Sequence, residues 1–267
     1  MFRSSRAKVV AVLSAAVLAA VLGGTSGTAS AAGAGDVDHD GIPDSVDNCI
    51  VVANHSQADR NGNHVGDACD GANSERTVSA LRYNLSLAGL NEVMGAVTAG
   101  PMPAYGSKAR GYVRWQPDLP IDPLVQMVFL QLWQGKVWYT HADGGYLFNR
   151  MGPDIQVHYH AVHYGTAPFD GRRAIIVEPG FPVDQFYDTI RMVQPGIYLG
   201  HSWSRSTYLG LPLGKPVRML TFILDFNHPD VSPTECPLCQ LGLDQLGLQI
   251  QSPTGPANPL VPVPPIG

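Results

Sequence analysis

The second half of the chain alternates apolar and polar residues over short stretches, which is the two-residue period of β-strands. Turn residues separate six such stretches, at residues 136–141, 146–150, 155–164, 173–178, 197–205 and 218–227. Gly144-Gly145 and Phe169-Asp170-Gly171 are typical of hairpin connections, so the series predicts an antiparallel meander. Such a sheet packs helices on one face or closes into a small barrel.

Two stretches ahead of these strands have apolar residues at helical spacing, residues 87–97 and 123–133. The second opens with Asp122-Pro123, a pair typical of helix N-termini. The composition changes from acidic to mixed near residues 71–75. We therefore expect an α+β domain with N-terminal helices over residues 76–235.

The first 34 residues begin with a basic head, Arg3, Arg6 and Lys8, followed by an apolar run over residues 9–22. This order is typical of a bacterial secretory signal peptide, and cleavage could follow Ala31 or Ala34. The alternative is an uncleaved membrane anchor, but the run is shorter than the ~20 residues that span a bilayer. We expect a secreted, extracellular product with no transmembrane segment in the mature chain.

The negative charge is concentrated in one segment. Between residues 36 and 70 lie eight Asp and one Arg, while the whole chain carries a net charge of −5. The rest of the mature chain is close to neutral, which excludes a basic nucleic-acid footprint. The acidic segment points to a cation as its partner.

The carboxylates of this segment are regularly spaced. A first loop has Asp at positions 1, 3, 5, 9 and 12, which are Asp36, Asp38, Asp40, Asp44 and Asp47. Position 7, where a backbone carbonyl is the ligand, is Ile42. Gly41 at position 6 allows the sharp bend that returns the twelfth residue to the centre. Alternate oxygens around one point suit calcium, which takes six to eight hard oxygen ligands.

A second loop begins 23 residues later and repeats the spacing with fewer charges. Its corresponding positions are Asp59, Asn61, Asn63, Asp67, Asp70 and Val65. His64 stands where Gly is expected, although Gly62 and Gly66 lie nearby. We expect about two calcium ions, the second bound more weakly. The alternative, a solvated linker, gives no reason for carboxylates at alternate positions.

The motifs Asp47-Asn48-Cys49 and Gly66-Asp67-Ala68-Cys69-Asp70 resemble a thrombospondin type 3 repeat over residues 36–71. The resemblance implies acidic loops around calcium with little regular secondary structure, and a disulfide between Cys49 and Cys69. It also implies a role as a spacer or in cell adhesion, presenting the second domain to an extracellular surface or protein partner. A short acidic segment buries little apolar area, so metal and disulfide replace a core, the disulfide contributing about 3 kcal/mol.

Short pieces of the larger domain, among them Pro195-Gly196-Ile197-Tyr198-Leu199-Gly200, resemble lipocalin-like bacterial domains of unknown function. The resemblance implies a calycin-like β-barrel. Such a barrel holds one small apolar ligand. Aromatic residues that could line it are Trp133, Trp138, Tyr146 and Phe148, with Trp115 and Trp203 as further candidates, and the alternative for each is an ordinary core position.

An enzyme is the second function class. His158 and His160 share a face if strand alternation is regular, with Asp154 on the same alternation and His163 on the other face. Such a group could hold zinc or act as an acid–base pair. Exposed strand histidines are the simpler interpretation, and no nucleophile elbow, HExxH or P-loop motif is present in the sequence.

Two features remain near the C-terminus. Cys236 and Cys239 have CxxC spacing without a second half, which predicts a local disulfide in an exported protein, with redox activity as the alternative. Residues 252–267 are Pro-rich and predict an extended tail.

Overall fold

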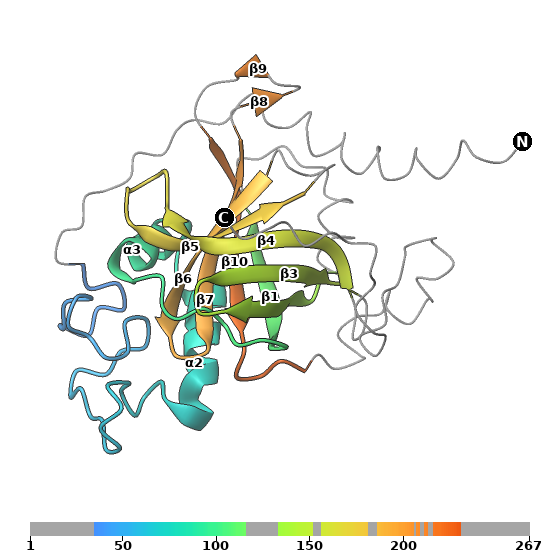
Figure 1. The fold of residues 1–267 in the computed structure, drawn as a ribbon. Helices are drawn as coiled ribbons and strands as arrows, with labels where there is room; N and C mark the ends of the chain where they lie inside the picture. The colour runs from blue at the N-terminus through green and yellow to red at the C-terminus, as the bar shows by residue number, and fades with distance from the viewer. Residues whose placement is uncertain are drawn as a thin grey trace, which may run out of the picture.

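The structure is a computed structural model that describes residues 35–115, 133–151, 156–180, 186–205, 207–208, 211–212 and 216–230. Its centre is a closed barrel of eight antiparallel strands in the order β1-β10-β7-β6-β5-β4-β3-β2 (Figure 1). The barrel strands are β1 Lys108–Trp115, β2 Gly135–His141, β3 Gly144–Arg150, β4 Gln156–Thr166, β5 Arg173–Pro179, β6 Phe186–Gln194, β7 Ile197–Ser204 and β10 Val217–Asp225. A separate two-stranded ladder joins β8 Thr207–Tyr208 to β9 Leu211–Pro212.

Short helices lie between the acidic segment and the barrel. They are η2 Gly71–Asn73, α2 Ser74–Ser79, the π-helical η3 Ala80–Asn84 and α3 Leu87–Ala96. The Ser86 side chain caps α3 by accepting a hydrogen bond from the Gly89 amide (3.1 Å), which confirms the first predicted helix. The second predicted helix, at 123–133, falls almost entirely outside the described residues, as do residues 1–34 and 231–267.

The prediction of an antiparallel sheet is confirmed, and the structure decides that it closes into a barrel. All six predicted strands are present, while β1 and β6 were not predicted. β6 reads as a poor strand because Asp188 and Arg191 interrupt its apolar residues, yet both side chains are buried in the barrel wall. β1 closes the barrel by pairing with both β2 and β10.

One end of the barrel is covered by the chain that leads into β1. Tyr164 and Tyr198, on opposite sides of the barrel, donate hydrogen bonds to the carbonyls of Gly100 (2.9 Å) and Pro101 (2.8 Å). Thr140 donates to the carbonyl of Pro103, and Met102 packs against the interior side chains. This end is therefore closed by residues 97–107.

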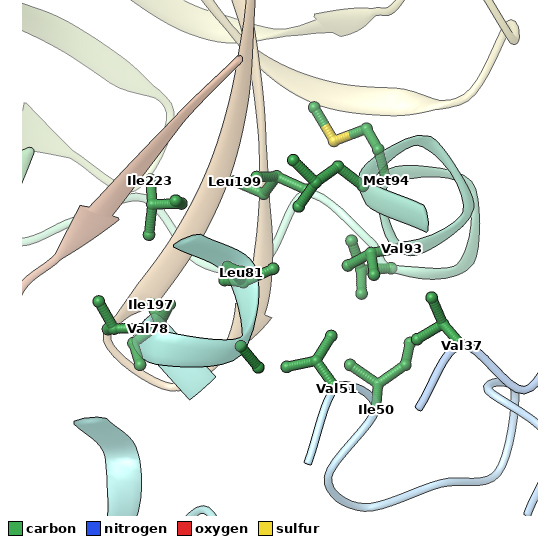
Figure 2. Packing of buried hydrophobic residues seen from close by; sticks show 13 residues of the cluster. Val37, Ile50, Val51, Val78, Leu81, Val93, Met94, Ile197, Leu199 and Ile223 are labelled. Carbon is green, nitrogen blue, oxygen red and sulfur yellow. The ribbon is translucent and has the colours of Figure 1, made fainter. Parts of the chain in front are cut away.

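The outer face of β7 and β10 supports a second core. Ile197, Leu199 and Ile223 point away from the barrel interior toward α2, η3 and α3, where they meet Leu81 and Val93 (Figure 2). The helical elements α2, η3 and α3 thus bury their apolar faces against the barrel wall.

The acidic segment contributes to this same core. Val37, Ile50 and Val51 are buried at 6%, 8% and 4% exposure and lie beside the residues of α3 and η3 (Figure 2). In Figure 1 the segment, in blue, lies next to these helices. The acidic segment is thus packed onto the barrel through a shared core.

In the described part of the chain, no helix combines the length and hydropathy needed to cross a membrane.

The shared core predicts that acidic segment and barrel unfold together. Ile50→Ala should lower the free energy of unfolding by about 2 kcal/mol, because it removes buried methyl groups at the contact. Tryptophan fluorescence of the barrel and far-UV circular dichroism should report one transition, shifted to lower denaturant. Val46→Ala, at an exposed side chain, serves as control. Two separate transitions, with that of the barrel unshifted, would contradict the shared core.

Candidate calcium-binding module

The first acidic loop brings three carboxylates together. Oxygens of Asp36, Asp38 and Asp40 all lie within 4.8 Å of one another. Backbone amides hold them there: Gly41 donates to Asp36 Oδ2 (2.9 Å) and Ile42 donates to Asp40 Oδ1 (2.8 Å). The Ile42–Asp40 bond, like that from the Asp40 amide to Asp38 Oδ1 (3.2 Å), forms an Asx turn, since the short Asp side chain reaches the amide two residues later, whereas the Gly41–Asp36 bond spans five residues.

Two further carboxylates flank the cluster. Asp44 Oδ1 accepts from the Val37 amide (2.9 Å), and Asp47 Oδ1 accepts from the Cys49 amide and from Gln57 Nε2 (both 2.8 Å). Asp44 and Asp47 therefore also hold the loop closed through these hydrogen bonds.

The first loop is short of positive charge. Burial, followed by the charges of Asp40 and Asp47, raises the pKa of Asp38 from 3.8 to about 6. Burial also raises the pKa of Asp44 and of Asp47. Asp38 Oδ2 is buried with no hydrogen-bond partner among the described residues. Crowded carboxylates with an unsatisfied buried oxygen fit a hard divalent cation, which supplies the missing charge.

The two loops share one backbone path. In the second loop the His64 amide donates to Asp59 Oδ2 at 2.9 Å, as Gly41 does to Asp36. Positions 4 and 6 are left-handed in both loops: φ is 63° at His39 and 91° at Gly41, and 70° at Gly62 and 67° at His64. Each loop thus has one Gly and one His at these two positions, and His64 keeps the bend despite its Cβ.

The charges of the second loop are partly balanced by neighbouring donors, although Asp67 Oδ2, like Asp38 Oδ2, accepts no hydrogen bond from the described residues. Asn61 Nδ2 and Asn63 Nδ2 both donate to Asp70 Oδ2, at 2.7 and 3.0 Å, and these bonds help to lower the pKa of Asp70. Asp67 pairs with Arg60 at 3.4 Å. The amide of Val65, at position 7, donates to Asn63 Oδ1 (2.9 Å). With amides in place of two carboxylates, this loop has less need of a cation than the first.

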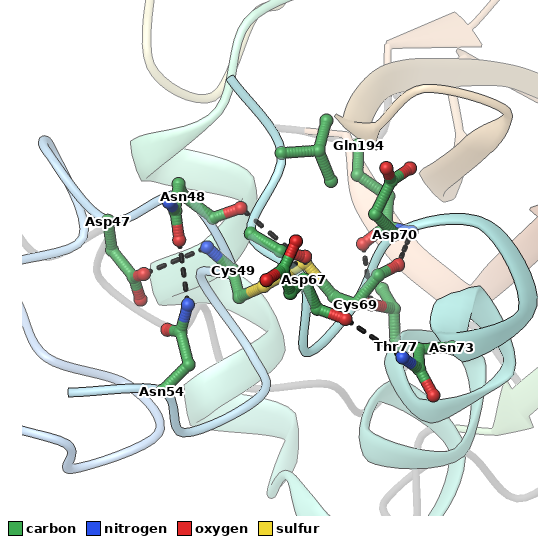
Figure 3. The surroundings of a disulfide bond; sticks show 12 residues. Asp47, Asn48, Cys49, Asn54, Asp67, Cys69, Asp70, Asn73, Thr77 and Gln194 are labelled. Atoms are coloured by element: carbon green, nitrogen blue, oxygen red, sulfur yellow. Dashed lines mark hydrogen bonds between the residues drawn. A yellow bond between two sulfur atoms is a disulfide. The ribbon is translucent and has the colours of Figure 1, made fainter. Parts of the chain in front are cut away.

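A disulfide joins the two loops, and it is the predicted Cys49–Cys69 pair. Figure 3 shows this bond and its surroundings, and both cysteines are buried. The Cys69 carbonyl accepts from Gln194 Nε2 (3.0 Å), and Gln194 Oε1 accepts from Thr77 Oγ1 (2.6 Å). Gln194 ends β6, so one buried amide ties the disulfide to α2 and to the barrel; no sequence pattern indicates this role.

With this geometry established, comparison with known proteins identifies the segment. Residues 34–57 match the family model of the thrombospondin type 3 repeat. The match ends before the second loop, where the Asn and His replacements occur. The repeat indicates calcium binding, and the disulfide fits an extracellular protein.

The other comparisons concern the whole chain. A crystal structure of a protein from Thermomonospora curvata is similar, with 13% identity and a TM-score of 0.35, over 58% of this chain and 95% of that chain. No curated protein matches the chain.

The four aromatic residues predicted to line a ligand site are divided between two faces. Trp133 and Trp138 belong to the interior core. Tyr146 and Phe148 lie on the other face of β3, where Tyr146 stacks on Tyr139 at 5.2 Å between ring centroids. Of the further candidates, Trp203 stacks on Phe169 outside the barrel (5.3 Å). The side chain of Trp115 lies outside the described residues.

The histidines considered for an enzyme site are separated. The register between β3 and β4 shifts at residue 158, where His158 is exposed with φ 56°. His160 is buried at 6% exposure, and His163 is exposed and pairs with Glu178 at 3.4 Å. The bulge breaks the alternation on which the shared face depended. Asp154, Cys236 and Cys239 lie outside the described residues.

Relief of the left-handed strain at position 6 should stabilise the repeat. His64→Gly should raise the free energy of unfolding by about 0.5–1 kcal/mol, because Gly adopts this φ without a Cβ clash. Ser56→Gly, at an exposed residue without positive φ, should lower it slightly. Equal effects of the two substitutions in urea unfolding would show that His64 is not strained.

The raised pKa of Asp38 predicts a pH dependence in chelator. Its folded pKa of about 6 exceeds the ordinary 3.8, so the stability it contributes is complete below about pH 4 and is lost as pH rises through 6. The difference in unfolding free energy between wild type and Asp38→Asn should follow this course, and calcium should flatten it at neutral pH. If, without calcium, the wild type instead becomes more stable than Asp38→Asn as the pH rises, repulsion among the carboxylates does not raise the pKa of Asp38.

Proposed function

We propose that the chain is a secreted calcium-binding protein in which calcium fastens the thrombospondin type 3 repeat to the barrel. The observation that carries this proposal is the cluster of Asp36, Asp38 and Asp40, within 4.8 Å of one another and including a buried, unsatisfied oxygen. Asp44, Asp47 and the carbonyl of Ile42 would complete the ligand set. The second loop would take a second, weaker ion.

The position of Val37 connects the cation to the fold. Val37 lies between the ligands Asp36 and Asp38 and is buried in the shared core, and its amide donates to Asp44. A cation that orders these carboxylates would therefore also hold Val37 in place. This arrangement supports a docked, calcium-stiffened module rather than a spacer that holds the barrel away from a surface.

A role outside the cell is supported by the signal-peptide-like sequence of residues 1–34, by the disulfide and by the exposed face of the repeat. A secreted protein meets calcium concentrations that suit weak extracellular sites. The exposed side of the repeat would then present the barrel to an extracellular surface or protein, in keeping with an adhesive role.

Substitution of a central ligand should have opposite effects with and without calcium. Asp38→Asn should weaken calcium binding, on the order of tenfold, measured by calorimetry, because it removes one ligand charge. In chelator at pH 7 the same variant should melt at a higher temperature than the wild type, because a repelling charge is gone. A merely acidic surface would not give this reversal.

Two controls separate the loops from bulk charge. Asp143→Asn removes an exposed carboxylate in the turn between β2 and β3 and should leave both measurements unchanged. Asp59→Asn should affect only the weaker binding event. If the wild type takes up no calcium at millimolar concentration, the proposal is wrong.

A further inference from the structure

A charged pair crosses the interior of the barrel near the end opposite residues 97–107. Lys136 on β2 and Asp188 on β6 lie on opposite sides of the strand order, yet Lys136 Nζ is 3.1 Å from Asp188 Oδ2. The Lys136 side chain is 4% exposed and that of Asp188 13%. Ions are costly to bury, and calcium binding makes no use of this pair.

Asn149 lies at the centre of the polar groups around this pair. Its Oδ1 accepts from Lys136 Nζ (3.1 Å) and from the indole Nε1 of Trp133 (3.0 Å). Both partners are donors only, so the orientation of the Asn149 amide is determined. Its Nδ2 must then donate to His160 Nε2, at 2.9 Å.

This bond determines the tautomer of His160. Because Nε2 accepts, the proton of the neutral ring is on Nδ1. Burial lowers the pKa of His160 well below its ordinary value, which agrees with a neutral ring. The Nδ1–H group is buried and has no hydrogen-bond partner among the described residues.

The surroundings supply further donors and an apolar wall. The indole Nε1–H of the fully buried Trp138, on the same face of β2 as Lys136, also has no hydrogen-bond partner among the described residues. The rings of Trp133 and Phe222 lie 5.9 and 5.4 Å from Lys136 Nζ. A buried donor without an acceptor costs about 1–3 kcal/mol, so a group that supplies an acceptor oxygen would be favoured here.

We propose that this end of the barrel interior binds a small, largely apolar molecule through a neutral acceptor oxygen, a ketone, ester or amide carbonyl, which accepts the hydrogen bond of His160 Nδ1–H. A neutral oxygen fits better than a carboxylate because Asp188 already balances Lys136, so an anion would leave an uncompensated buried charge. The site is one of binding, and it does not depend on the calcium proposal.

The test uses 2-octanone as the probe on the full, calcium-loaded chain. Long-range proton–nitrogen NMR should show His160 as the Nδ1–H tautomer, and 2-octanone should shift its Nδ1 signal saturably. His201, a buried histidine whose Nδ1 lies 2.9 Å from Thr221 Oγ1 on the outer side, should not shift. Octanoate should bind more weakly than the ketone.

A matched pair of variants completes the test. His160→Phe should bind 2-octanone at least tenfold more weakly by calorimetry, while His163→Phe, an exposed position on the same strand, should bind as the wild type does. If His160→Phe does not fold, the tautomer of His160 and its shift with 2-octanone in the wild-type NMR spectra still test the proposal. The proposal is overturned by any one of four results: an Nε2–H tautomer, no saturable shift at His160, tighter binding of octanoate than of 2-octanone, or unchanged affinity in His160→Phe. None of these results would change the outcome of a calcium titration, so the two proposals fail separately.

Discussion

The rest of the structure depends on the packing of Val37, Ile50 and Val51 against the helices that cover the barrel wall. These side chains, with the partly buried Val52, make the apolar contact between the acidic segment and the helices. Without them, the helices and the outer faces of β7 and β10 would expose part of their apolar surface to water. Burial of this shared surface couples a segment with almost no regular secondary structure to a closed barrel.

Charge explains why the two loops differ although their backbones agree. Repulsion among close carboxylates destabilises the first loop until a cation is present, whereas amide donors already stabilise Asp70 in the second. The same local path therefore produces one loop whose crowded carboxylates favour a cation and one whose carboxylates are partly satisfied by amide donors. Calcium would act chiefly on the loop that carries Val37 into the shared core.

Buried charges in the barrel, like the carboxylates of the loops, need partners that balance them. Arg191 is fully buried on the outer face of β6, where Asp170 and backbone carbonyls satisfy its guanidinium. In the interior, Lys136 and Asp188 satisfy each other across the barrel. Two neutral donors in the interior are not satisfied: the bond between His160 and Asn149 leaves the His160 Nδ1–H without an acceptor among the described residues, and the Trp138 indole N–H also has none there. A binding role for the barrel therefore rests on this incomplete satisfaction and not on an aromatic lining.

Local patterns in the sequence determined the acidic loops, the first predicted helix and six strands, because Asx turns, helix caps and strand alternation depend on residues a few positions apart. The motifs of the thrombospondin type 3 repeat are equally local, and the Cys49–Cys69 pair was predictable because the resemblance implies it. Barrel closure through β1 and β6, the docking of the repeat and the Lys136–Asp188 pair were decided only by tertiary structure. Each joins residues distant in sequence, and a buried charge such as Asp188 resembles a surface charge until its partner is placed beside it.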